Sequence, residues 1–515
     1  MKRRTNPRSR FAAGIIVASA AVTLSFAIHG PAQAYDPATT HAGLTERSVL
    51  ASALNKVLAR RLARPLGLFE PVALDVRFID QVRDQTGRYV MSRLMALDPS
   101  HGYRPSDDGV NSALGWIVAG SVVAGTPAER GQNTFFDPGR GRGLHQGGSV
   151  SEMTHSFRLM LDGGGSLRRI ATGTNFNFTG MPSTEWLVSP DNDVGLIVFY
   201  EQLDRAVSEA QPLARGNALA RALLALGGTL AILQDAGEPA HVRNDLRGSF
   251  LGSRWGSVFD RSSEFERYVA EAYGRIGVPA AASPVKRPNV IAFISARDAQ
   301  GLADRTQRRF FSAGTLPEDG VVDRDTTTQD VVQQARDSLV YGLPAIPRLD
   351  LRELGRRRYV YATGEDSSHE PVLTATPPAR GARRRVLAYE RVPGRVRFTL
   401  DAAIYDDSAR ALLTEIGAYG AGLIDHLFRA DLTVTINAGA AELSLQGTSG
   451  ALKAGKVRIY AEDQSGTRRE LRSAPLPAGA TVSVAIPAGT RRLAAVLRGE
   501  DDAGPLVAVA EQLTP

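Results

Sequence analysis

The sequence predicts a mainly α-helical domain followed by a small C-terminal β-sandwich. Apolar residues recur at helical spacing from about residue 35 to 345, and beyond about residue 430 the spacing changes to two, which is typical of strands. The 515-residue chain contains no cysteine, which excludes disulfides, thiolate catalysis and cysteine-based zinc sites. Stability therefore has to come from core burial, and the chain is long enough for two or three domains.

Residues 1–34 have the features of a secretory signal peptide. Five basic residues precede a mostly apolar stretch from Phe11 to Ile28, and Ala32-Gln33-Ala34 has the small-x-small pattern of a cleavage site. We expect cleavage after Ala34, which makes Tyr35 the new N-terminus and the protein secreted or periplasmic. No later run reaches the ~18 apolar residues of a membrane span, so we expect no transmembrane segment after cleavage.

The charge of the chain depends strongly on the predicted signal peptide. The whole chain carries +7, from 61 basic and 54 acidic residues. The signal peptide contains five of the basic residues and none of the acidic ones, so its removal leaves 56 against 54, a charge of +2. Proteins that bind nucleic acid through its phosphates usually present a strongly basic surface. The sequence therefore gives no strong signal for a nucleic-acid partner.

Residues 35–372 are expected to form the helical domain. Apolar spacing and capping residues predict helices at Thr45–Arg61, Asn217–Asp235 and Ser262–Tyr273. The second of these repeats leucine every three or four residues and is suited to the centre of a helical bundle. Loops rich in glycine and proline lie between the helices, at 125–148 and 163–180.

The C-terminal part divides into a connection and a sheet region. Residues 373–429 are expected to form a connecting loop, rich in proline and arginine up to residue 395, and a helix at 402–429. Residues 430–515 are expected to form the β-sandwich. Its strands are predicted by alternating apolar and polar residues at 432–436, 456–460 and 481–486.

The segment from Gln234 to Asp245 carries the clearest chemical signal. Asp235 ends the apolar helix, and His241 follows six residues later, just beyond Pro239, which breaks the helix. A carboxylate and an imidazole are both ligands that zinc accepts. The segment therefore predicts a metal site at the end of the central helix.

Three further segments occur in the same order around this motif. They are Tyr35 to Thr45, which contains His41; Asn133 to Gly139, with the preceding Ala124-Gly125-Thr126-Pro127; and Ser262 to Val269, which contains Glu266. Together the four segments resemble the zinc-dependent phospholipase C and single-strand nuclease superfamily over roughly residues 35 to 275. The resemblance implies a phospholipase C-like helical domain and a phosphoric-ester hydrolase in which metals neutralise the phosphodiester and activate water.

The resemblance also implies which residues bind metal. One zinc site of the family corresponds to Gly125, Thr134, Ala231 and Asp235, of which only Asp235 is a good zinc ligand. A second corresponds to the Tyr35 N-terminus, His41 and Asp235, and a third to His241, Ser262 and Glu266. The implied metal ligands are therefore Tyr35, His41, Asp235, His241 and Glu266, with Asp235 as the catalytic residue and one or two zinc ions as the cofactor.

Several alternatives remain open at this level. His145 or His155 could supply a ligand to the depleted first site from the adjacent loop. The losses at four ligand positions are compatible with a hydrolase of reduced metal content that acts on a lipid or small phosphodiester. They are equally compatible with a non-catalytic binding or surface-interaction protein built on the same scaffold. The sequence specifies neither the substrate nor the oligomeric state.

Overall fold

The computed structural model describes most of the chain beyond the expected signal peptide. The described residues are 35–75, 85–97, 100, 102–125, 128–149, 175–245, 263–278, 283–317, 320–321, 327–341, 358–367, 369–376, 383–392, 395–437, 439–477 and 479–514. The predicted signal peptide, His155 and Ser262 lie outside these residues.

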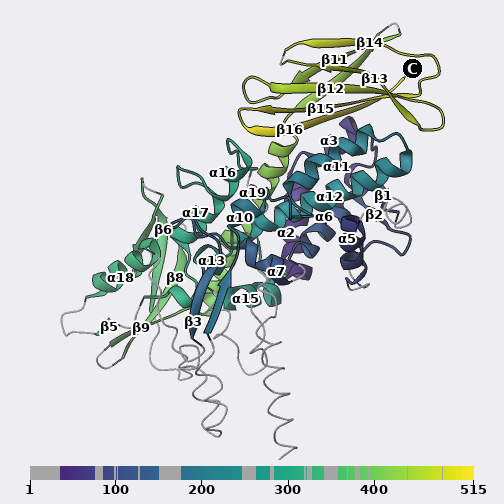
Figure 1. The fold of residues 1–515 in the computed structure, drawn as a ribbon. Coiled ribbons are helices and arrows are strands. Elements are labelled where there is room, and N and C mark those ends of the chain that lie inside the picture. Colours follow the sequence, from purple (N-terminus) through teal and green to yellow (C-terminus); the bar gives the residue numbers. More distant parts are fainter. Residues whose placement is uncertain are drawn as a thin grey trace, which may run out of the picture.

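The centre of the helical region is α12 (Pro212–Asp235), which has Pro212 in its first turn and is buried along most of its length. It packs against α6 (Ala113–Val123), α11 (Leu196–Ser208) and α19 (Ala402–Leu427) (Figure 1). A Cβ at Gly227 would lie 1.9 Å from the Ile117 carbonyl oxygen, so glycine is required for the close approach of α12 to α6. The helix is long and apolar enough to cross a membrane, but 89% of its most apolar window is buried inside the protein.

The first predicted helix is interrupted. The structure has α2 (Ala42–Ala51) and α3 (Leu54–Arg61) in place of one helix at Thr45–Arg61. The Ser52 hydroxyl donates to the Val49 carbonyl and accepts from the Leu54 amide, and Asp425 accepts from the Ala53 amide. Serine competes in this way with the helix backbone for hydrogen bonds, so the chain turns at Ser52.

The other predicted helices agree closely with the structure. The prediction for 262–273 corresponds to α15 (Glu264–Ala272), which Ser263 and Glu266 cap reciprocally, and the prediction for 402–429 corresponds to α19. The remaining helical elements are short or peripheral: η1 (Pro37–His41), η2 (Gly67–Phe69), α5 (Gln85–Met95), α7 (Ala128–Gly131), η3 (Gln132–Thr134), α10 (Ser183–Trp186), α13 (Pro239–Val242), α16 (Val290–Ile294), α17 (Leu302–Arg309), η4 (Ala313–Thr315) and α18 (Thr328–Tyr341).

A five-stranded antiparallel sheet lies in the region for which the sequence predicts helices and a loop. Its order is β5 (Gly320–Val321), β9 (Arg395–Thr399), β8 (Arg384–Val392), β6 (Arg358–Glu365) and β7 (Pro371–Thr374). In β8 the arginines have specific partners: the Arg384 guanidinium lies 4.0 Å from the centre of the Phe310 ring, and Arg385 pairs with Asp407. Arginines held in this way do not interrupt a strand, which is why the arginine-rich segment after residue 373 is not simply a loop.

The C-terminal region consists of two antiparallel sheets that share one apolar core, as the prediction of a β-rich end requires. Figure 1 shows them at the end of the molecule opposite the five-stranded sheet. One sheet contains β10 (Asp431–Asn437), β11 (Ala440–Gln446) and β14 (Thr481–Ala485), and the other contains β13 (Arg468–Pro475), β12 (Lys453–Glu462), β15 (Arg492–Asp501) and β16 (Gly504–Leu513). The described residues also form two small antiparallel sheets of two strands each, β1 (Pro71–Ala73) with β2 (Val110–Ser112) and β3 (His145–Ser149) with β4 (Asn175–Thr179).

Buried charges join the helical region to the C-terminal sheets. Arg215 of α12 lies 3.1 Å from Glu462 of β12, which also accepts a hydrogen bond from Arg468 at 2.9 Å. Arg468 contacts Glu511 at 2.7 Å, and Arg492 contacts the other oxygen of Glu511 at 2.8 Å. We refer to these five residues as the interdomain cluster.

Candidate metal centre

The residues of the central motif meet other parts of the chain at the end of α12. Asp235 is the last residue of α12, and Glu238 caps α13 through its side chain, which accepts from the His241 amide. His41 ends η1, and Glu266 lies in the first turn of α15. Residues far apart in the sequence are thus brought together by helix termini, where the direction of a side chain is well defined.

Two histidine–carboxylate pairs form the centre. His41 Nε2 lies 3.1 Å from Asp235 Oδ1, and His241 Nε2 lies 3.6 Å from Glu266 Oε1. All four residues are at most 5% exposed. The Tyr35 ring meets the His41 ring edge-on, with 6.1 Å between the ring centres. The structure therefore brings the five predicted ligands into one buried region, and their role as metal ligands stays a prediction.

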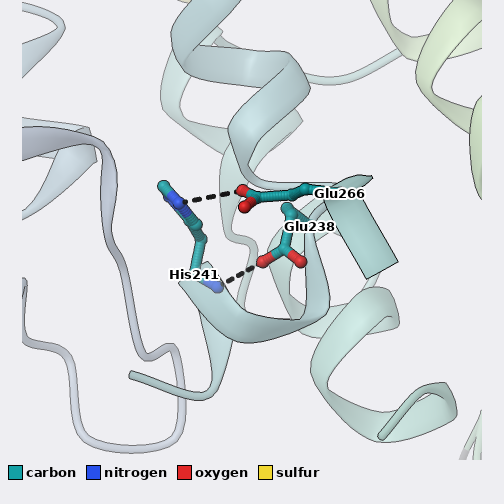
Figure 2. Close-up of side chains that lie close together, drawn as sticks. All are labelled: Glu238, His241 and Glu266. Carbon is teal, nitrogen blue, oxygen red and sulfur yellow. Dashed lines mark hydrogen bonds and ion pairs between the residues drawn. The ribbon is translucent and has the colours of Figure 1, made fainter. Parts of the chain in front are cut away.

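Glu238 belongs to the same group, although the sequence analysis did not single it out. Glu238, His241 and Glu266 each offer one ligand atom, and these atoms all lie within 4.8 Å of one another. Figure 2 shows the His241 ring facing the Glu266 carboxylate, and the Glu238 carboxylate facing the main-chain nitrogen of His241. The signal was present in the motif, because Glu238 directly precedes Pro239 and lies three residues before His241, where a side chain can cap the following turn. We call Asp235, Glu238, Glu266, His41 and His241 the acidic centre.

Hydrogen bonds to the other ring nitrogen orient each histidine. His41 Nδ1 lies 2.5 Å from Gln234 Oε1, and His241 Nδ1 lies 3.1 Å from the Thr134 hydroxyl. Phe135 stacks on the His241 ring with 3.8 Å between the ring centres. Thr134 occupies a position where the family resemblance places a ligand, and it contacts a predicted ligand instead.

Electrostatics show that the centre is short of positive charge. Burial raises the pKa of Glu238 to about 8, and burial lowers the pKa of His241 to about 4. Burial also opposes charge on His41, but the charge and hydrogen bonds of Asp235, with Gln234, outweigh it and raise the His41 pKa. The pKa of the Tyr35 phenol is raised well above its usual value, first by burial and then by Glu238, Glu266 and Asp235.

The donor set fits a divalent metal. Three buried carboxylates face two histidines, and buried anions are stable only when a cation or proton compensates them. Nitrogen and carboxylate oxygen ligands suit zinc and similar first-row ions. Glu238, His241 and Glu266 would hold such an ion, with His41 and Asp235 as the adjacent pair.

A small cavity adjoins the His41–Asp235 pair. Its volume is about 20 Å³, enough for one water-sized group, and Trp186, Asn192 and Ser121 are among the residues that line it. Gly125, Thr134 and Ala231 also line it, as does Asp235. The four positions that the resemblance assigns to one zinc therefore do meet in space, but three of them contribute no good metal ligand.

The suggested replacement ligands do not fill this gap in the part of the chain that is described. His145 begins β3, where its amide donates to Asn244, and it is not among the described groups of metal-ligating side chains. Within the described ranges, the group whose ligand atoms lie this close together is Glu238, His241 and Glu266. His155 and Ser262 lie outside the described residues.

Comparisons with known proteins give limited information. No protein-family model matches the chain, and no curated protein matches it. Among solved structures, alpha toxin from Clostridium absonum is 10% identical, with 95% of this chain and 96% of that chain covered and a TM-score of 0.25. Alpha-toxin of Clostridium perfringens from avian strain SWCP is 9% identical, with 93% and 98% covered and a TM-score of 0.23. Similarity at this level fixes neither the fold of this chain nor its activity.

Proposed function

We propose that the protein binds one or two divalent metal ions, zinc first among them, in the acidic centre and hydrolyses phosphoric esters. The observation that carries the proposal is the group formed by Glu238, His241 and Glu266, which is buried and has ligand atoms within 4.8 Å of one another. Burying this many carboxylates without a cation or a proton to compensate them would be strongly unfavourable. A lipid or a small phosphodiester is the proposed substrate class.

The chain's own residues define where such a reaction would occur. When bound, a divalent ion supplies Lewis-acid polarisation of a phosphoryl oxygen. Asp235 lines the cavity and faces His41 at 3.1 Å, so this pair can hold a proton at the cavity wall. Asp235 is thus the proposed catalytic residue, since it contacts both the cavity and a proposed ligand.

The N-terminus is the third component of the proposal. We propose export with cleavage after Ala34, so that the Tyr35 amine becomes available as a ligand. Burial of the Tyr35 side chain against His41 and Phe265 supports this, because it places Tyr35 beside the centre. Mass spectrometry of the exported protein should find Tyr35 as the first residue, and an intact Met1 would contradict the idea.

Metal content and turnover test the proposal together. Elemental analysis of the chain that begins at Tyr35 should give one or two zinc ions, and a phosphodiester such as bis-p-nitrophenyl phosphate should be hydrolysed in a zinc-dependent way. Asp235→Asn should remove turnover, whereas Glu470→Gln, at an exposed carboxylate of β13, should not. Three tightly bound ions per chain would contradict the assignment of a depleted first site.

A second function is favoured by one observation. Gly125, Thr134 and Ala231 surround the cavity with groups that are not good zinc ligands, as expected if the scaffold has kept metal binding for structure alone. In that case the protein is a non-catalytic binding protein. Stoichiometric zinc binding without hydrolysis of any phosphodiester would select this function over the hydrolase.

A further inference from the structure

We infer that Gln234 and Thr134 are positioning residues that hold both histidines of the acidic centre in the Nδ1–H form, so that each Nε2 is left as the metal-binding atom. The inference rests on the proposed metal binding and goes beyond it, because neither residue is itself a proposed ligand. It also gives Thr134 a role that differs from the one the family resemblance assigns to its position.

The Gln234 amide has a second partner in the Thr45 hydroxyl. Gln234 Nε2 donates to the Thr45 hydroxyl at 2.8 Å, which directs Oε1 toward His41 Nδ1 at 2.5 Å. An amide oxygen only accepts hydrogen bonds, so His41 Nδ1 has to carry the proton. Thr45, Gln234 and His41 are at most 5% exposed, so water does not compete for these groups.

Thr134 acts on His241 in the same way. Its hydroxyl donates to the Gly131 carbonyl at 3.0 Å, so the hydroxyl oxygen is left to accept from His241 Nδ1 at 3.1 Å. Phe135 stacks on the ring at an angle of 15° and fixes its plane.

The consequence is the same at both histidines. In the neutral Nδ1–H form, Nε2 presents a lone pair, and it does so toward a carboxylate oxygen at 3.1 Å for Asp235 and 3.6 Å for Glu266. Two electron-pair donors face each other favourably only when a proton or a metal cation lies between or beside them. Outer hydrogen bonds of this kind orient metal-ligating histidines and raise their affinity.

Ring-nitrogen NMR on the metal-free protein, with ¹⁵N-labelled histidine, tests the inference directly. At a pH where both rings are neutral, His41 and His241 should each show a protonated Nδ1 and an unprotonated Nε2. Gln234→Met should move His41 toward the Nε2–H form and weaken zinc binding by about 10- to 100-fold in a chelator competition. Thr134→Val should move His241 toward the Nε2–H form in the same way, because it removes the hydroxyl that accepts from Nδ1, and Thr134→Ser should restore the original spectrum.

Gln202→Met is the matched control for loss of a buried amide. Gln202 lies in the neighbouring helix α11, is 5% exposed, and makes none of the described hydrogen bonds to either histidine. It should lose stability without any change of tautomer. An Nε2–H form in the unchanged protein would overturn the inference, and this result does not depend on whether any variant folds. A Gln234→Met protein with an unchanged spectrum and unchanged zinc affinity would also overturn it. Failure of the unchanged protein to bind zinc would overturn the proposed function instead, while the spectrum still decides the tautomers.

Discussion

The acidic centre and the interdomain cluster each contain five charged or titratable residues, all of them buried except Arg492, but they balance charge differently. In the interdomain cluster, three arginines surround two glutamates, and each carboxylate contacts more than one guanidinium at 2.7–3.1 Å. In the acidic centre, three carboxylates face two histidines, one of which has its pKa lowered to about 4 by burial. The interdomain cluster contains enough arginines to compensate its carboxylates, whereas the acidic centre needs a proton or a metal ion from outside the chain.

Crowding of the arginines does not remove their charge. Burial lowers the pKa of Arg215 to about 10, and nearby Arg468 adds to the effect, but the group stays protonated at neutral pH. The interdomain cluster is therefore complete within the folded protein, whereas the acidic centre is complete only with a proton or a metal. This difference makes distinct predictions for variants, ligands and pH.

The largest expected effect comes from breaking the interdomain cluster. Arg468→Met removes the guanidinium that contacts both Glu462 and Glu511 and leaves each carboxylate with one close arginine. Removal of one partner from a buried ion pair costs about 3–5 kcal/mol. Chemical denaturation should show this loss in the free energy of unfolding. The adjacent Arg469 is exposed, so Arg469→Met is the control and should change stability little. Equal effects of the two variants would show that the cluster does not join the two regions.

The acidic centre should respond to metal in a way that the interdomain cluster does not. Zinc at 100 times its dissociation constant should stabilise the unchanged protein by about 2.7 kcal/mol. Glu266→Gln should abolish this gain, yet the metal-free variant should be no less stable, because the amide still accepts from Ser263 and one buried negative charge is removed. Thermal unfolding with and without zinc measures both effects. A strong loss of metal-free stability in Glu266→Gln would show that the carboxylate is balanced by the protein alone.

A smaller effect is expected from pH at the junction of α19 with the C-terminal sheets. Burial, with help from Arg429, lowers the pKa of His426 to about 4, whereas a histidine in the unfolded chain titrates near 6.5. Between these values the unfolded chain binds a proton that the folded protein does not, so this group reduces stability as pH falls through that window. His426→Gln should flatten the slope of stability against pH. His369→Asn, at a side chain that is 47% exposed, should leave the slope unchanged.

The sequence predicted local features better than their boundaries. The apolar repeat identified α12 because its leucines face neighbours on all sides. Asp235 and His241 are both buried, but they pair with His41 and Glu266, and their role as metal ligands stays a prediction. It did not predict the break at Ser52, which depends on Asp425 from a distant helix. It also missed β8, because the partners of Arg384 and Arg385 lie outside the strand. Glu238 was overlooked because a capping role and a ligand role give the same local pattern.

One helix has a mechanical consequence for the whole molecule. Arg215 and Asp235 lie 20 positions apart on α12, so about 30 Å of continuous helix separates the interdomain cluster from the acidic centre. A helix packed on several sides behaves as a stiff rod. If contact with a large surface tilted the C-terminal sheets, α12 would tilt with them, and Asp235 at its other end would be displaced slightly.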